Sequence, residues 1–425
     1  MPYSRRIFLR NSAFALAGVG SAPLWLQRAA LCADKPAEQP GQRKKVLVAI
    51  FQRGAADGLN IVVPHAERRY YDLRPTIAIP RPLARGTSPD AAIDLDGFFG
   101  LHPSLAPLVP LWKKQQLAII HAAGSPDPTR SHFDAQDYME SGTPGLKATT
   151  DGWLNRALPP QTDGQPSAVR AVSLGATMSR TLAGPNRAVA VESLGNFTVR
   201  DNSAAKALQA MYGETSDVIL GGTARETFEA VSILQSIQKT PYQPAGGANY
   251  PRGRFGDSMK QIAQLIKADV GLEVAFADIG NWDHHVNEVG PKASVGVLAN
   301  VLGEFGGSLA AFSQDLGDRM EDVVVVTMSE FGRTARENGN RGTDHGHANV
   351  MFVMGGPVAG GKVYGDWPGL AQEQLYESRD LALTTDFRDV LSEAVALHLG
   401  NQNIQSVFPN YAASPDKFRN WLKTV

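Results

Sequence analysis

The sequence predicts an α/β protein, an α/β/α sandwich with a mostly parallel central sheet. Residues 45–51 (KVLVAIF) are a continuous apolar, β-branched run that ends in a glycine-containing turn, which is typical of a strand buried on both faces. Residues 294–316 place apolar side chains at helical spacing. The apolar runs 272–279 and 322–327 flank that helix, and a strand–helix–strand unit of this spacing makes its two strands parallel.

Further short apolar runs predict the rest of the sheet, at residues 117–121, 169–174, 187–191 and 350–354. Polar segments rich in His and acidic residues follow several of these strands. Because ligand sites of open α/β sheets lie at the carboxyl ends of the strands, we expect these segments to share one edge.

Composition excludes several classes of protein. Of 425 residues, 43% are hydrophobic and 20% charged, which excludes wholesale disorder. The formal net charge of -1 gives no electrostatic footprint for nucleic acid, so we expect no nucleic-acid partner. A single Cys excludes a disulfide framework and a cysteine-based metal cluster.

The first residues predict an export signal. Arg5-Arg6-Ile7-Phe8-Leu9 precedes a short apolar stretch, in the order of a twin-arginine signal, with an ordinary secretory signal or a membrane anchor as alternatives. The stretch is too short and too rich in Gly and Ala for a stable span. We therefore expect a signal over 1–33, a flexible tether over 34–44 and one α/β domain over 45–425 with a Gly/Pro-rich middle insertion. The export machinery is then a partner, and the location is the periplasm or the exterior.

The His and acidic residues of the mature chain fall into a few clusters that suit a divalent metal. Carboxylate oxygen and neutral imidazole nitrogen are ligands for zinc and other transition metals, and carboxylates alone suit Ca²⁺ or Mg²⁺. One or two ions are expected. The candidate ligands are Asp57, Asp283, His285, Glu330, His345 and His347. Asp57 precedes a glycine, so a turn residue is its alternative role.

Three residues are candidates for direct chemistry. Ser131 opens a predicted helix, where its hydroxyl either attacks an ester or caps the helix toward Asp134. Arg130 and Arg333 are candidates to pair an anionic substrate group, with a surface salt bridge as the alternative. His132 is either a metal ligand or a hydrogen-bond donor to one.

Several segments together resemble a known bacterial family, the twin-arginine-exported domain-of-unknown-function 1501 family, in the alkaline-phosphatase-like (sulfatase-like) superfamily. The resemblance covers nearly all of the mature chain. The segments that carry it are 53–60 (RGAADGLN), 130–133 (RSHF), 282–285 (WDHH), 327–334 (TMSEFGRT), 342–346 (GTDHG) and 355–365 (GGPVAGGKVYG).

The superfamily resemblance implies an order of parts: a metal-binding Asp after the first strand, a nucleophile at a helix start, an Asp/His pair, a later acid and a final His. The chain matches this order at Asp57, Ser131, Asp283 with His285, Glu330, and His345 or His347. It departs where many members have Asp-His, since Phe331 follows Glu330, and it lacks the sulfatase nucleophile pattern. These departures favour a one-metal or altered two-metal site.

The function expected from these observations is metal-dependent hydrolysis of a phosphate or sulfate ester outside the cytoplasm. The attacking group is Ser131 or a water molecule, and the substrate a small molecule or a glycan ester. The alternative is a non-catalytic exported binding protein that keeps the fold and one ion; a structural role in the envelope is a third interpretation.

Overall fold

The computed structural model describes residues 43–84, 86, 88–147, 149–160, 166–196, 218–238 and 241–423. The predicted export signal and all but two residues of the predicted tether lie outside these ranges. Residues Lys44–Val425 form one compact unit. None of the helices in the described ranges combines the length and the hydropathy that crossing a bilayer requires.

A nine-stranded sheet runs through this unit in the order β11-β5-β10-β9-β1-β8-β6-β7, with β12 paired to β5. Each described strand of this sheet runs in the same direction except β10, which pairs antiparallel with both β5 and β9. The α/β class with a mostly parallel sheet is therefore confirmed. The strands are β1 (Val46–Gln52), β5 (Leu117–Gly124), β6 (Ala171–Leu174), β7 (Val189–Val191), β8 (Val274–Ile279), β9 (Val323–Ser329), β10 (Asn349–Gly355), β11 (Lys362–Tyr364) and β12 (Thr385–Asp386).

The predicted strand–helix–strand unit is present, formed by β8, a long helix and β9. Strand β1 lies between the two strands and pairs parallel with both, with Leu47 opposite Val274 on one side and Val324 on the other. A smaller antiparallel sheet consists of β2 (Val62–Val63), β4 (Gly100–Leu101) and β3 (Ile93–Asp94).

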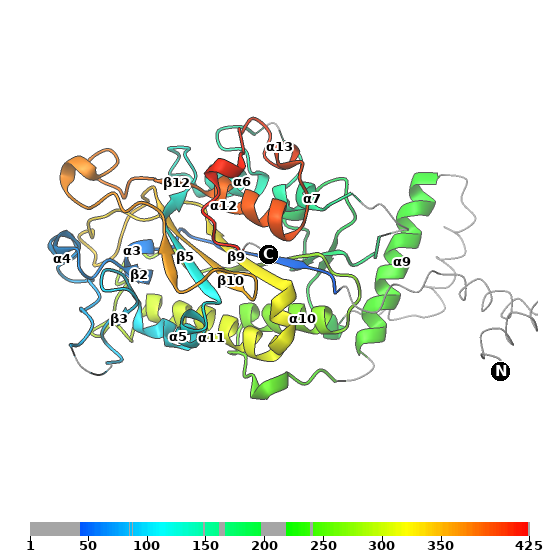
Figure 1. Ribbon diagram of the computed structural model, residues 1–425, viewed down its shortest axis with the longest axis horizontal. Coiled ribbons are helices and arrows are strands. Elements are labelled where there is room, and N and C mark those ends of the chain that lie inside the picture. Colours follow the sequence, from blue (N-terminus) through cyan, green and yellow to red (C-terminus); the bar gives the residue numbers. More distant parts are fainter. Residues whose placement is uncertain are drawn as a thin grey trace, which may run out of the picture. The chain divides into compact units, whose positions relative to one another are not determined.

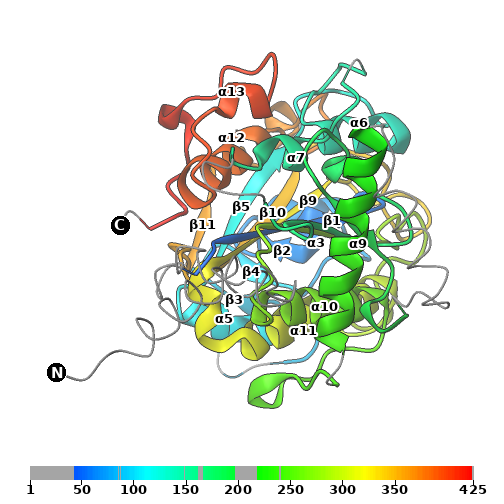
Figure 2. The same cartoon turned by 90° about the vertical axis from the view of Figure 1, so that its right-hand side faces the viewer.

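Helices cover both faces of the large sheet, as Figures 1 and 2 show. Alternate residues of β1 belong to different hydrophobic clusters because successive strand side chains point to opposite faces. Val48 and Ile50 pack in the cluster of α10 and α11, and Leu47 and Phe51 in that of α7, α12 and α13. The described helices are α3 (Gly58–Ile61), α4 (Arg68–Leu73), α5 (Val109–Lys113), α6 (His132–Ser141), α7 (Trp153–Ala157), α9 (Val218–Gln238), α10 (Arg254–Lys267), α11 (Val297–Leu316), α12 (Phe387–Glu393) and α13 (Ile404–Val407).

The reversed direction of β10 brings one more loop to the edge predicted for a site. The segments after β1, β5, β8 and β9 leave the carboxyl ends of parallel strands, whereas residues 344–347 precede β10. Since β10 runs antiparallel to its neighbours, its amino end lies beside their carboxyl ends. Five polar segments, distant in sequence, therefore meet at one edge.

Candidate metal centre

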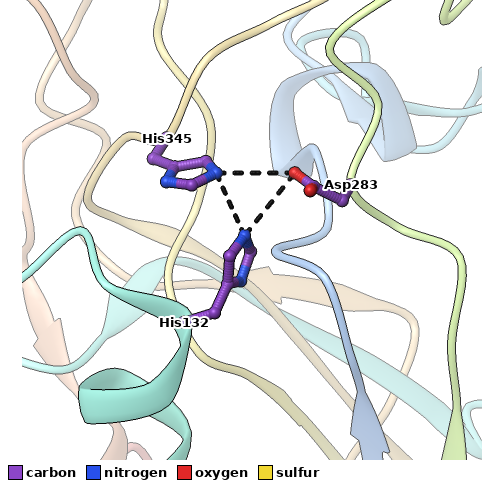
Figure 3. Close-up of side chains that lie close together, drawn as sticks. All are labelled: His132, Asp283 and His345. Atoms are coloured by element: carbon purple, nitrogen blue, oxygen red, sulfur yellow. Dashed lines mark hydrogen bonds and ion pairs between the residues drawn. The ribbon is translucent and has the colours of Figure 1, made fainter.

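Three ring nitrogens and one carboxylate oxygen converge at this edge. Ligand atoms of His132, Asp283 and His345 all lie within 4.8 Å of one another (Figure 3). His285 joins them, because its Nε2 is 3.0 Å from His345 Nε2 and 3.0 Å from Asp283 Oδ1. His132 Nε2 is likewise 3.0 Å from His345 Nε2. The four side chains come from α6, the loop after β8 and the loop before β10.

Local structure explains how the loops approach so closely. His132 is the first residue of α6, which Ser131 caps by accepting a hydrogen bond from the Asp134 backbone N–H. Arg333 and His345 form an isolated β-bridge. A Cβ on Gly346 would lie only 2.3 Å from the Arg333 carbonyl carbon, so this position needs glycine for the two segments to pass each other.

The second nitrogen of each imidazole has a hydrogen-bond acceptor. His132 Nδ1 lies 3.0 Å from Glu330 Oε1, and His285 Nδ1 lies 3.0 Å from Asp344 Oδ1. His345 Nδ1 lies 2.8 Å from the Arg130 carbonyl oxygen. A carbonyl or carboxylate oxygen only accepts, so each Nδ1 carries a proton, and a ring in its neutral form presents an Nε2 lone pair to the centre.

These three lone pairs fit a metal ion. Two ring nitrogens 3.0 Å apart need a proton or a metal cation between them, and the Asp283 carboxylate adds a negative charge to the same space. Metal-binding histidines characteristically donate their other N–H to a carboxylate or carbonyl, as all three do here. The described residues therefore include a His/Asp site whose donor chemistry suits a divalent ion.

Solvent reaches the centre. The side chains of His132 and His345 are each 25% exposed and that of Asp283 is 48% exposed. Structural zinc sites have four protein ligands, whereas catalytic sites leave one position for solvent or substrate. A site with this accessibility can admit a further ligand.

The acidic residues at the centre are held in the charged form. Burial opposes ionisation of Asp283, but the hydrogen bond and charge of Arg333 outweigh it, so the pKa of Asp283 lies below its usual range. Burial also opposes ionisation of Glu330, whose pKa is lowered overall by hydrogen bonds from His132, Gln136 and the Gly54 N–H. The hydrogen bond to Glu330 in turn raises the pKa of His132.

The structure places Glu330 behind His132. Its side chain is fully buried, and its Oε1 accepts from His132 Nδ1, Gln136 Nε2 and the Gly54 N–H. In this position it orients a ligand and fixes its tautomer. Asp344 occupies the same position behind His285.

The two arginines predicted to face substrate are engaged with the protein. Arg333 is buried and donates to the carbonyl oxygens of residues 54, 55, 282 and 343 and to Asp283. Its Nη1 also lies 3.5 Å from His285 Nε2. Arg130 binds Glu377 at 2.6 Å and Asp380 at 2.7 Å. Arg333 thus positions Asp283, and Arg130 contributes its backbone carbonyl.

Besides Glu330, two further predicted ligands lie outside the group. Asp57 is buried, and Arg74, the residue that follows α4, donates to both of its carboxylate oxygens. His347 is buried with its ring stacked on Tyr376, the centroids 4.3 Å apart. Burial lowers the pKa of His347.

The sequence allows His132 as a metal ligand or as a hydrogen-bond donor to one, and the structure places its Nε2 in the group. The signal was its position directly after Ser131 at the start of a helix that follows a strand. The role of Asp344 was not predicted, although it stood in the Asp344-His345 cluster. Its carboxylate oxygen Oδ1 accepts from Asn338 as well as from His285.

A family model described as "Protein of unknown function (DUF1501)" matches residues 99–407, more than half of the chain. No curated protein matches the sequence.

Among solved structures, the chain resembles the C-terminal periplasmic domain of EcEptC from Escherichia coli, in complex with Zn. The TM-score is 0.33 at 9% identity, with 75% of this chain and 74% of that chain covered. It also resembles alkaline phosphatase from the Antarctic bacterium TAB5, with a TM-score of 0.30 at 10% identity over 75% of this chain and 93% of that chain.

Proposed function

The chain belongs to the DUF1501 family, and we propose that this member is an exported, metal-dependent hydrolase of phosphate or sulfate esters. The observation that carries the proposal is the convergence of three Nε2 atoms, from His132, His285 and His345, beside the Asp283 carboxylate. Nitrogen-rich sites with one carboxylate favour zinc over Ca²⁺ or Mg²⁺. One zinc ion per chain is therefore the expected content.

The residues that contact the proposed ligands orient them and set their protonation. Glu330 and Asp344 hold the Nδ1 protons of His132 and His285, so that Nε2 remains free. Arg333 keeps Asp283 ionised and in place. A zinc ion held there supplies Lewis-acid chemistry, withdrawing electron density from an ester oxygen.

The position of α6 supports an anionic substrate. His132 is the first residue of this ten-residue helix, so the positive end of the helix dipole faces the centre. Either the Ser131 hydroxyl or a water molecule attacks the ester. The capping contact of Ser131, 3.5 Å from its Oγ to the Asp134 nitrogen, is long enough for the hydroxyl to exchange this partner for another.

A binding protein without turnover is the second candidate, favoured by a specific observation. Arg333 and Arg130 both bind carbonyl or carboxylate groups of this chain, so neither guanidinium is free to neutralise the charge of a phosphate or sulfate being transferred. A site of this kind holds an anionic ligand through the metal ion and α6 alone.

Metal analysis and a turnover screen separate the two. Purified protein is measured for bound metal, then assayed on an aryl phosphate, an aryl phosphodiester and an aryl sulfate. We expect one equivalent of zinc and turnover of at least one ester, lost in His345→Ala. Stoichiometric zinc without turnover of any ester supports the binding protein, and the absence of metal refutes both.

Export through the twin-arginine pathway is part of the proposal. The pair Arg5-Arg6 is what distinguishes this signal from an ordinary secretory one. Replacing both by Lys is expected to retain the precursor in the cytoplasm. Normal export of that variant would contradict this pathway.

A further inference from the structure

A cavity of about 420 Å³ adjoins the metal centre. Asp344 lines it and also accepts from His285 Nδ1, and Arg379 lines it and donates to the His345 carbonyl oxygen. The cavity and the centre therefore share a wall. Two further arginines, Arg69 and Arg336, line the same cavity.

The acidic groups of the cavity wall already have donors. The Glu337 carboxylate accepts from the backbone N–H groups of Thr76 and Ile77 and from the Thr76 hydroxyl. Asp344 accepts from Asn338 and His285. Both bonds to Asp344 fall on Oδ1, and among the described residues neither acid forms an ion pair with Arg69 or Arg336.

The arginines, by contrast, retain free donors. Within the described residues, the exposed Arg336 side chain makes no hydrogen bond or ion pair. Arg69 meets Asp72 at 3.8 Å, a pair whose side chains are 56% and 47% exposed, and such exposed pairs are weak. A guanidinium offers five N–H groups in a fork that matches an oxyanion. The free cationic donors near the centre thus lie in this cavity, whereas Arg333 and Arg130 are engaged.

Apolar side chains complete the cavity. Leu73, Leu370 and Leu375 line it together with the arginines. A wall of this composition suits an anionic group carried on an organic framework such as a sugar ring, rather than a free inorganic ion.

We infer that this cavity binds a second anionic group of the substrate, with Arg336 as its principal donor. The inference rests on the proposed function and narrows its substrate class to esters that carry one anionic group at the metal centre and another several bonds away. The second group is a phosphate, a sulfate or a carboxylate, since all three present oxygens to a guanidinium.

Three probes on one sugar ring test the inference. Zinc-loaded protein is titrated calorimetrically with glucose 1-phosphate, glucuronic acid 1-phosphate and glucose 1,6-bisphosphate. We expect at least one of the two doubly anionic probes to bind about tenfold or more tightly than glucose 1-phosphate, and the better one identifies the preferred second group. Equal affinity for all three probes would overturn the inference.

Two variants test whether the cavity causes the preference for doubly anionic probes. In Arg336→Gln the advantage of the doubly anionic probe is expected to fall about 10-fold to 100-fold, the range for a charge-assisted hydrogen bond. Arg252→Gln, at an exposed arginine that does not line the cavity, is the matched control and should keep the advantage. An Arg336→Gln protein with the full advantage would refute the role of Arg336.

The same titration in metal-free protein separates this inference from the proposed function. Binding in the cavity needs arginines and no metal, so weak binding of the bisphosphate is expected to persist there and to drop in Arg336→Gln. Zinc binding and turnover together with an ineffective Arg336→Gln would overturn this inference alone. Arg336-dependent binding in a protein that never binds zinc would overturn the proposed function alone.

Discussion

Replacing Glu330 by Gln tests whether a carboxylate behind His132 tunes the metal centre. The buried Glu330 Oε1 accepts from His132 Nδ1 at 3.0 Å, from Gln136 Nε2 at 3.0 Å and from the Gly54 N–H at 2.8 Å. The glutamine carbonyl oxygen can keep these three bonds. Ser329 Oγ, which donates to Glu330 Oε2 and to the Gln52 carbonyl oxygen, then faces an amide group, and it can accept from that group by donating to the carbonyl alone.

The substitution therefore removes the charge while preserving the shape and the three hydrogen bonds to the retained oxygen. We expect the free energy of unfolding to fall by about 1 kcal/mol, the difference between a charge-assisted and a neutral hydrogen bond. Zinc affinity should fall about 10-fold to 100-fold, the usual effect of losing a partner of a metal-binding histidine.

Competition with a chromophoric chelator measures the affinity, at pH 7 and at pH 8, because Glu330 also raises the pKa of His132 and so favours its protonation. The matched control is Glu393→Gln, since Glu393 is equally buried and accepts backbone N–H groups far from the centre in sequence. A Glu330→Gln protein with wild-type zinc affinity, or a control that loses as much, would refute the reasoning.

Three further variants probe the surroundings of the centre. Asp57→Asn removes the carboxylate that pairs with the buried Arg74 and leaves Glu288 as its neighbouring acid, so it should cost less than the about 3–5 kcal/mol of an uncompensated buried charge, with zinc content unchanged; loss of zinc from a folded variant would support Asp57 as a ligand. Ser131→Ala should lower the free energy of unfolding by about 1 kcal/mol through loss of the helix cap. If Ser131 is the nucleophile, this variant loses turnover; if a water molecule attacks, turnover persists. Burial lowers the pKa of His398 to about 4, so the unfolded chain takes up a proton near pH 6.5 that the folded chain refuses, and stability is lost between pH 6.5 and 4. Urea unfolding measures the free energy of unfolding at both ends of this pH range. Between pH 6.5 and 4, His398→Gln should lose about 3 kcal/mol less of it than the wild type does, and an equal loss in both proteins would contradict a role of His398.

The sequence was sufficient for the elements that depend on local pattern. The valine-rich run of β9 and the apolar spacing of α11 predicted a parallel unit, and the chain forms it. The same logic placed Asp283, His285 and Glu330 at one sheet edge. His345 reaches that edge for a reason the pattern did not contain, because β10 runs antiparallel to its neighbours.

The local sequence pattern does not predict which charged side chains contact one another in the folded chain. Nothing in the sequence around Asp57 indicated that Arg74, 17 residues later, would take both of its oxygens. Similarly, Arg333 binds carbonyl groups from three separate loops, an arrangement that exists only once those loops have met. The division into signal, tether and a single α/β domain with a Gly/Pro-rich insertion stays a prediction.

The most direct test of the central claim is a crystal structure of zinc-loaded protein with anomalous scattering recorded at the zinc edge. We expect one strong peak about 2.0–2.1 Å from Nε2 of His132, His285 and His345, with Asp283 beside it. A peak bound elsewhere, or a protein that crystallises from zinc-containing solution with no peak between these three nitrogens, would contradict it.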